Sequence, residues 1–173
     1  QLTVRAASAT TVSGSRSALC CVVDYEDDAR PAAAPLDLVF FNGSFGFRLD
    51  GRYSVTFLVG HRCTPAPWIN VVANAGFGFI ASVEGGGYTW SINSQQNQIT
   101  PWANDAVSDP PGEAIYLRDA ETGALWCPTA LPIRDNSPYT VAHGPGYTRY
   151  QHAVPGIATA LVQFIPGDHP AKV

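Results

Sequence analysis

The sequence predicts an all-β fold, an antiparallel β-sandwich. Segments of strand character recur about every 8–12 residues, with a turn signal in each gap, as in sandwich domains. The 173 residues include 16 Gly and 14 Pro, which favour many turns. No window keeps a helical period of apolar residues for more than two turns, so long helices are not expected.

The strands are expected from residue 36 onward. Residues 36–42 form a continuous apolar run that stops at a turn, whereas residues 52–59 alternate between polar and apolar side chains. The letters DAETG at residues 119–123 predict a hairpin loop that ends in Gly. The ten predicted strands cover residues 36–42, 52–59, 68–75, 76–84, 87–93, 113–119, 124–129, 139–144, 146–154 and 157–166.

The first part of the chain differs in character, so we expect two regions. Residues 1–35 are rich in Ser, Thr and Ala and end in an acidic, proline-containing linker, with strands at 2–6 and 18–25 as the structured parts. Residues 36–173 form the sandwich domain. Residues 171–173 resemble the opening of another strand, so the sandwich is expected to be incomplete at its C-terminal end and part of a larger multidomain enzyme.

Composition excludes several function classes. A net charge of −4 and ten scattered basic residues argue against a nucleic-acid partner. No apolar run approaches the ~20 residues that span a bilayer. The four cysteines lack zinc-type spacing, which favours reduced thiols and a cytoplasmic location. His143 and His152 lack a third ligand, so neither a metal nor another cofactor is expected.

Candidate binding residues lie between residues 67 and 119, where Trp is interspersed with Asn, Asp, Gly and Pro. An aromatic face can cover the C–H face of a pyranose, while short amides and carboxylates bind its hydroxyls. This chemistry predicts a saccharide site. Its candidate residues are Trp90, Asn93, Trp102, Asn104, Asp105, Asp109 and Glu113.

Each candidate has a structural alternative. Trp90 also fits a strand residue that faces the core, and Trp102 fits a contact between domains. Asp105 and Asp109 could meet by chance the carboxyl separation of inverting glycosidases, but Asp in a turn-rich segment more often bonds its own backbone. No residue of this chain is therefore assigned as catalytic.

Residues 41–173 resemble the N-terminal β-sandwich of glycoside hydrolase family 94, and above all the phosphorylase-like part of the cyclic β-1,2-glucan synthases. The resemblance rests on FNGSFGF, TPAPWINVVANAGFGF, FIPGDHPAKV and the long run from Gly85 to Thr129, GGGYTWSINSQQNQITPWANDAVSDPPGEAIYLRDAETGALWCPT. It implies a supersandwich-like domain that supports a helical (α/α)6 barrel. In this family the barrel carries the general acid, so whether this chain alone is an enzyme stays open, and we expect it to be inactive.

The expected role is therefore a non-catalytic sandwich that supports the barrel of a glycosyltransferase or inverting glycoside phosphorylase and contributes to glucan binding. The partners that the resemblance implies are a glucan or β-linked oligosaccharide, the helical-barrel domain of the parent chain and a second copy in a homodimer. The resemblance also allows a parent enzyme associated with the inner membrane. Two alternatives remain: a free-standing carbohydrate-binding module, and a purely structural or dimerisation domain.

Overall fold

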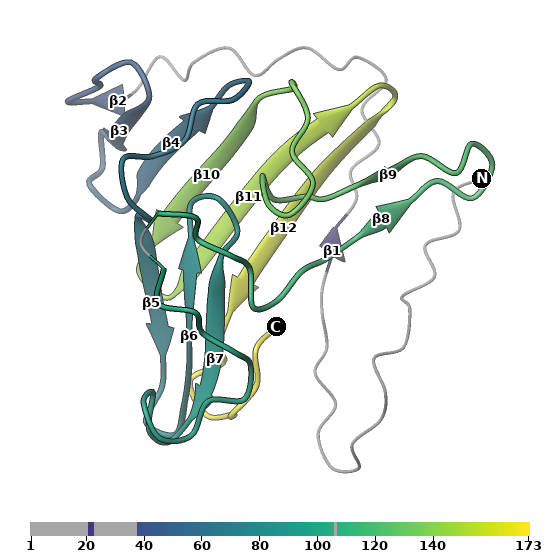
Figure 1. Cartoon of the computed structure of the whole chain (residues 1–173). Helices are drawn as coiled ribbons and strands as arrows, with labels where there is room; N and C mark the ends of the chain where they lie inside the picture. Colours follow the sequence, from purple (N-terminus) through teal and green to yellow (C-terminus); the bar gives the residue numbers. More distant parts are fainter. Residues whose placement is uncertain (1–20, 23–37, 106) are drawn as a thin grey trace.

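A computed structural model describes residues 21–22, 38–105 and 107–173. These residues form twelve β-strands and no helix (Figure 1). The strands are β1 (Cys21–Val22), β2 (Leu38–Val39), β3 (Phe45–Arg48), β4 (Ser54–Leu58), β5 (Ile69–Ala73), β6 (Phe77–Ser82), β7 (Gly87–Ser91), β8 (Leu117–Arg118), β9 (Leu125–Trp126), β10 (Tyr139–Gly144), β11 (Tyr147–Val154) and β12 (Ile157–Phe164). The predicted all-β class is confirmed.

The strands form three antiparallel sheets. The large sheet has seven strands in the order β1-β12-β11-β10-β4-β3-β2. The small sheet has the order β5-β6-β7, and β8 pairs with β9 in a separate hairpin. In Figure 1 the small sheet lies across the lower part of the large sheet, and the β8–β9 hairpin extends to one side.

The main core lies on one face of the large sheet. Tyr139 pairs with Leu58 and Tyr150 pairs with Leu161, which places all four side chains on that face. Val83, which follows β6, completes the buried cluster, and the half-buried Trp68 and Ile115 pack against it. Burial of these apolar side chains holds the two sheets together, because each buried large side chain contributes about 1.5–3 kcal/mol.

A smaller core lies between the small sheet and the end of the chain. Val72, Phe79 and Ala81 are buried there, and Ile165 packs against them. The Asn74 side chain donates hydrogen bonds to the carbonyl oxygens of Pro166 (3.0 Å) and His169 (2.8 Å). These contacts fix the chain after β12 on the small sheet.

A hydrogen bond through the core joins the large sheet to the small sheet. The buried Tyr150 hydroxyl of β11 donates to the carbonyl oxygen of Ser82 at 2.6 Å. Ser82 is the last residue of β6, and its side chain lies on the opposite side, toward the site described below. Burial raises the pKa of Tyr150, so the phenol keeps the proton that this bond needs.

Several predicted strands agree with the structure and others are shorter. The hairpin loop predicted at 119–123 is confirmed: Asp119 accepts hydrogen bonds from the amides of Glu121 and Thr122, and Gly123 has a φ of 75°. A turn between β5 and β6 separates the strands predicted at 68–75 and 76–84, and the Asn74 side chain accepts a hydrogen bond there from the amide of Gly76. Strand pairing over 113–119 is limited to β8, because Glu113 is held by side-chain contacts instead.

The prediction omitted β3, a four-residue strand interrupted by Gly46 that pairs with β4. The predicted strand at 171–173 is not formed. Val173 does exchange two backbone hydrogen bonds with Phe164, both 2.9 Å, so the residue pairs with the end of β12 without starting a strand. The predicted strand at 2–6 lies outside the described residues, and β1 falls inside the one predicted at 18–25.

Candidate saccharide-binding site

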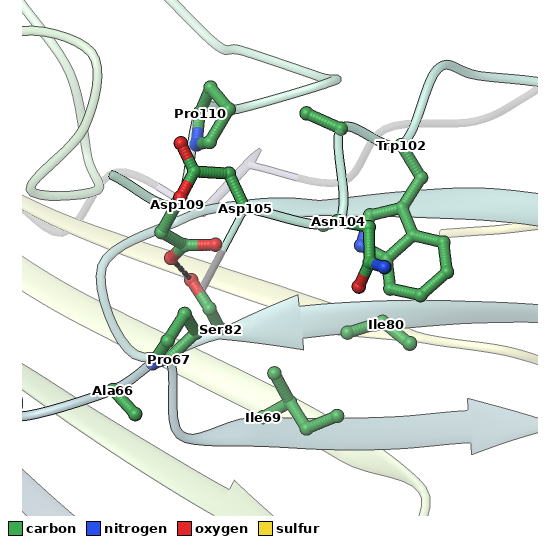
Figure 2. A pocket seen from close by; sticks show the side chains of 12 residues that line it. Ala66, Pro67, Ile69, Ile80, Ser82, Trp102, Asn104, Asp105, Asp109 and Pro110 are labelled. Carbon is green, nitrogen blue, oxygen red and sulfur yellow. Dashed lines mark hydrogen bonds between the residues drawn. The ribbon is translucent and has the colours of Figure 1, made fainter. Parts of the chain in front are cut away.

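A pocket of about 240 Å³ opens on the outer face of the small sheet. Three strands form its floor, and residues 102–105 together with Asp109 and Pro110 form its wall. Figure 2 shows Trp102 and Asn104 at one side, the carboxylates of Asp105 and Asp109 at the other, and isoleucine side chains between them. The lining residues are Ala66, Pro67, Ile69, Ile80, Ser82, Gly87, Trp102, Ala103, Asn104, Asp105, Asp109 and Pro110.

The strand register explains the apolar floor. Ile69 pairs with Ser82 across β5 and β6, so the two side chains share a face of the sheet. Ile80 lies two residues before Ser82 and therefore points to the same side. This face is open at its edge, where the Ile69 side chain is exposed.

Trp102 is positioned by an aromatic stack. The centroid of its indole lies 5.0 Å from the centroid of the Tyr88 ring, and the two planes make an angle of 18°. Tyr88 is buried in β7 and pairs with Ile80, so the stack holds the indole beside the floor. Trp102 remains 47% exposed, and the exposed indole surface borders the pocket.

Trp90 lies elsewhere on the same strand as Tyr88, covered by protein. Its indole rests on Gly78, where an added Cβ would lie 2.2 Å from the ring, and it packs at 5.4 Å against Tyr88. Only 9% of Trp90 is exposed and it does not line the pocket. Trp90 therefore packs against protein on the same face of the small sheet as Tyr88 and Ile80, whereas the buried Val72 and Phe79 lie on the other face.

Asp105 begins the turn that shapes the wall. One carboxylate oxygen accepts hydrogen bonds from the amides of Val107 (2.8 Å) and Ser108 (3.2 Å), and the other accepts from the Ser108 hydroxyl. The hydroxyl of Ser108 and these amides lower the pKa of the exposed Asp105. Asn104, just before it, has a φ of 49°, a left-handed conformation that Asn tolerates better than most residues.

Asp109 is the half-buried carboxylate of the pocket. Its side chain accepts a hydrogen bond from the Ser82 hydroxyl, which in turn accepts one from the amide of Gly86 at 2.8 Å. Burial raises the pKa of Asp109, and the negative charges of Glu84 and Asp105 raise it further. A Cβ added at Gly86 would lie 2.2 Å from the Asp109 carboxylate, so a side chain there would displace that carboxylate.

Glu113 and Asn93 lie outside the pocket lining. Glu113 accepts hydrogen bonds from the hydroxyls of Thr89 and Thr100 and pairs with Lys172. Burial raises the pKa of Glu113, but the Lys172 ammonium and these hydrogen bonds outweigh burial, so the net pKa is lowered. Asn93 follows the far end of β7 and accepts hydrogen bonds from the amides of Gln95 and Gln96 in a turn.

The structure therefore brings together, in one pocket, four of the seven residues that the sequence suggested: Trp102, Asn104, Asp105 and Asp109. Sequence reasoning did not name the apolar floor or Ser82. The alternation of residues 69–73 in β5 carried the missing information, because it places Ile69 and Val71 on one face and Asn70 and Val72 on the other.

Two negative findings apply to the residues that the structure describes. No group of three His, Cys, Asp or Glu side chains is arranged there to hold a metal ion. Nor does that part contain a helix of the length and apolar character needed to cross a membrane.

Comparison with known proteins identifies the family of this chain. The supersandwich domain of glycosyl hydrolase family 94 matches residues 52–173, which include every strand from β4 to β12 and the whole pocket. The chain belongs to this family. The match agrees with the resemblance seen in the sequence.

Individual relatives show how the chain relates to longer proteins. The cyclic beta-(1,2)-glucan synthase NdvB of Rhizobium meliloti (strain 1021) is 42% identical over 151 residues, which are 86% of this chain and 5% of NdvB. The N,N'-diacetylchitobiose phosphorylase of Vibrio furnissii is 33% identical over 112 residues, 63% of this chain and 14% of that protein. The solabiose phosphorylase of Paenibacillus borealis is 41% identical over 60 residues, 34% of this chain and 8% of that enzyme. The chain thus spans a small fraction of the relatives it matches.

Proposed function

We propose that this chain is a non-catalytic supersandwich portion of a glycoside phosphorylase or cyclic β-1,2-glucan synthase, and that its Trp102 pocket binds part of a glucan. The observation that carries this proposal is the half-exposed Trp102 indole, held against Tyr88 beside an apolar floor and two carboxylates. The names of the relatives, a glucan synthase and two disaccharide phosphorylases, support a saccharide as the ligand.

The two sides of the pocket suit the two kinds of surface on a sugar. The C–H face of a pyranose is apolar and packs on an indole or on isoleucine side chains. Its hydroxyls donate hydrogen bonds, and ionised carboxylates only accept them. Pockets for drug-sized ligands start at about 300 Å³, so the 240 Å³ here suits one sugar ring, with the rest of the chain on the surface.

The carboxylates have positions that favour binding over bond cleavage. The oxygens of Asp105 hold the backbone of the 105–108 turn, and Asp109 accepts the Ser82 hydroxyl. An inverting mechanism needs one carboxyl free to donate a proton and a second group free to act on the opposite face. Since NdvB and the phosphorylases extend far beyond the matched region, we assign bond cleavage to a helical-barrel domain that this sandwich supports.

Titration calorimetry on the chain tests the proposal. A β-1,2-linked glucose oligomer is expected to bind, and Trp102→Ala is expected to weaken binding at least tenfold, because loss of an aromatic platform removes the largest apolar contact. Tyr116→Ala is the matched control, since Tyr116 is an exposed aromatic residue outside the pocket. Absence of heat up to millimolar oligomer, or equal affinity in Trp102→Ala, contradicts sugar binding by this pocket.

A second candidate function is a structural or dimerisation platform. The outer face of β5 favours it, because Ile69 and Val71 are half exposed beside Trp102 and form an apolar surface. Sedimentation analysis distinguishes the two functions. A dimer that Val71→Asp converts to monomer, together with no effect of oligosaccharide on Trp102 fluorescence, supports the platform.

A further inference from the structure

We infer that the Trp102 pocket selects uncharged saccharides with free hydroxyls and rejects sugars that carry a phosphate. This inference rests on the proposed function and adds the chemical class of the ligand. It matters for a relative of phosphorylases, because substrates and products in such reactions differ by a phosphate group.

The first support is the charge of the pocket lining. Asp105 and Asp109 are the only ionisable groups among its twelve lining residues, and both are acids. None of these lining residues is Lys, Arg or His. Proteins bind phosphate through Arg, Lys or clustered backbone amides, and this lining offers no such cation.

The second support is that two cations outside the lining, Arg134 and Lys172, are already paired with acids. Arg134 is bound by the carboxylate of Glu84 and donates to the carbonyl oxygen of Arg62 at 2.7 Å. Lys172 is bound by Glu113. Both cations are nearly buried, with 14% and 13% of their side chains exposed, so their charge is neutralised within the protein.

The third support is the balance of donors and acceptors. The Ser82 hydroxyl already donates to Asp109, which leaves the Asn104 amide and the Trp102 indole N–H as the side-chain donors toward a ligand. The carboxylates supply acceptors in excess. A ligand that brings hydroxyl donors satisfies them, whereas a phosphate brings more acceptors and more negative charge.

The apolar floor narrows the chemical class of the ligand further. Ile69, Ile80 and Pro67 offer carbon surface and no hydrogen bonds. A ring with one C–H face and hydroxyls at its edge meets both the floor and the carboxylates. An open-chain polyol lacks the flat face, so we expect the pyranose ring to be required.

Binding of matched ligands to the full chain tests the inference. The probes are a β-1,2-linked glucose disaccharide, its 6-O-methyl ether as a control for size, and its 6-phosphate. We expect the neutral disaccharide and the ether to bind at least tenfold more tightly than the phosphate at low salt, and added salt to narrow the gap because it screens the carboxylates.

Isosteric variants separate charge from shape. Asp109→Asn and Asp105→Asn keep an oxygen that accepts the Ser82 or backbone hydrogen bond, and the double variant is expected to reduce the discrimination at least threefold. Glu121→Gln, an exposed acid in the β8–β9 loop, is the control for net charge. Circular dichroism confirms that each variant folds.

The outcomes separate the two proposals. If the phosphate binds as tightly as the neutral disaccharide, or if the double variant discriminates as well as the wild type, this inference is wrong while sugar binding stands. If no probe binds, both proposals are wrong.

Discussion

Lys172 and Glu113 form an ion pair in which Nζ lies 2.5 Å from Oε2, although the residues are 59 positions apart. The ammonium also lies 4.4 Å from the centroid of the Phe79 ring. Because Glu113 binds Thr89 and Thr100 as well, one carboxylate joins the last residues of the chain to β7 and to the loop that leads to Trp102.

Loss of this pair should destabilise the fold. Lys172→Met keeps an unbranched side chain but removes the charge, so Glu113 loses its countercharge, and we expect the free energy of unfolding to fall by about 2 kcal/mol. Urea unfolding measures the change. Lys172→Arg keeps the charge and serves as the control; an equal loss in both variants would assign the effect to packing rather than to charge.

The same pair predicts a pH dependence. The folded-state pKa of Glu113 lies below its ordinary value of 4.5, so its contribution is complete above pH 4.5 and is lost as the pH falls through the folded-state pKa. The difference in unfolding free energy between wild type and Lys172→Met should therefore be constant near neutral pH and shrink below pH 4.5. A difference that grows toward acid would contradict this assignment.

The Trp90–Gly78 contact predicts a severe effect of one methyl group. In Gly78→Ala the new Cβ would lie 2.2 Å from the indole of Trp90, a rigid ring that can only move as a whole. We expect a loss of about 2–3 kcal/mol from overpacking, measured by thermal or urea unfolding.

Gly76→Ala is the matched control for that substitution. It lies two residues away in the same turn-and-strand segment, and a methyl group added there would meet no atom within 4 Å. Replacing Trp90 by Leu in the Gly78→Ala background should restore part of the lost stability, because it removes the clash. An equal loss of stability at Gly76 and Gly78 would show that the clash with the indole is not responsible.

Cysteine reactivity offers a further prediction. Cys127 is a free thiol with no exposed surface, and burial raises its pKa, whereas Cys63 is free and exposed. We expect a thiol reagent at neutral pH to label Cys63 rapidly and Cys127 only on unfolding, as read by site-resolved mass spectrometry. Labelling of both at the same rate in the native chain would contradict the burial of Cys127.

The free thiols of Cys63 and Cys127 agree with the reduced state that the sequence predicts.

The long strands were predictable for a simple reason. Residues 139–164 alternate or run apolar between clear turns, so β10, β11 and β12 follow from periodicity alone. Strand β3 was missed because its four residues include Gly46, which weakens the alternation of polar and apolar side chains. Its strand conformation is stabilised by pairing with β4, which the local sequence does not reveal.

The site was predictable in its chemistry but not in its assembly. Trp102 stands out because a Trp in a turn-rich loop is poorly explained by burial, whereas Asp109 also suited a bond to its own turn. Glu113 carried the same acidic signal, yet its partner Lys172 is remote in sequence, and no local pattern reveals a salt bridge of that span. Trp90 illustrates the same limit, because only the register that places Gly78 opposite it shows where the indole lies.

Ser82 is fixed from two directions. Its carbonyl oxygen accepts the Tyr150 hydroxyl from the core, and its own hydroxyl is held between Gly86 and Asp109. A residue tied in this way has little conformational freedom left to lose when a guest molecule arrives. The recess beside it is preorganised, so association should proceed with a small entropic penalty from the protein and without rearrangement of the backbone beneath it.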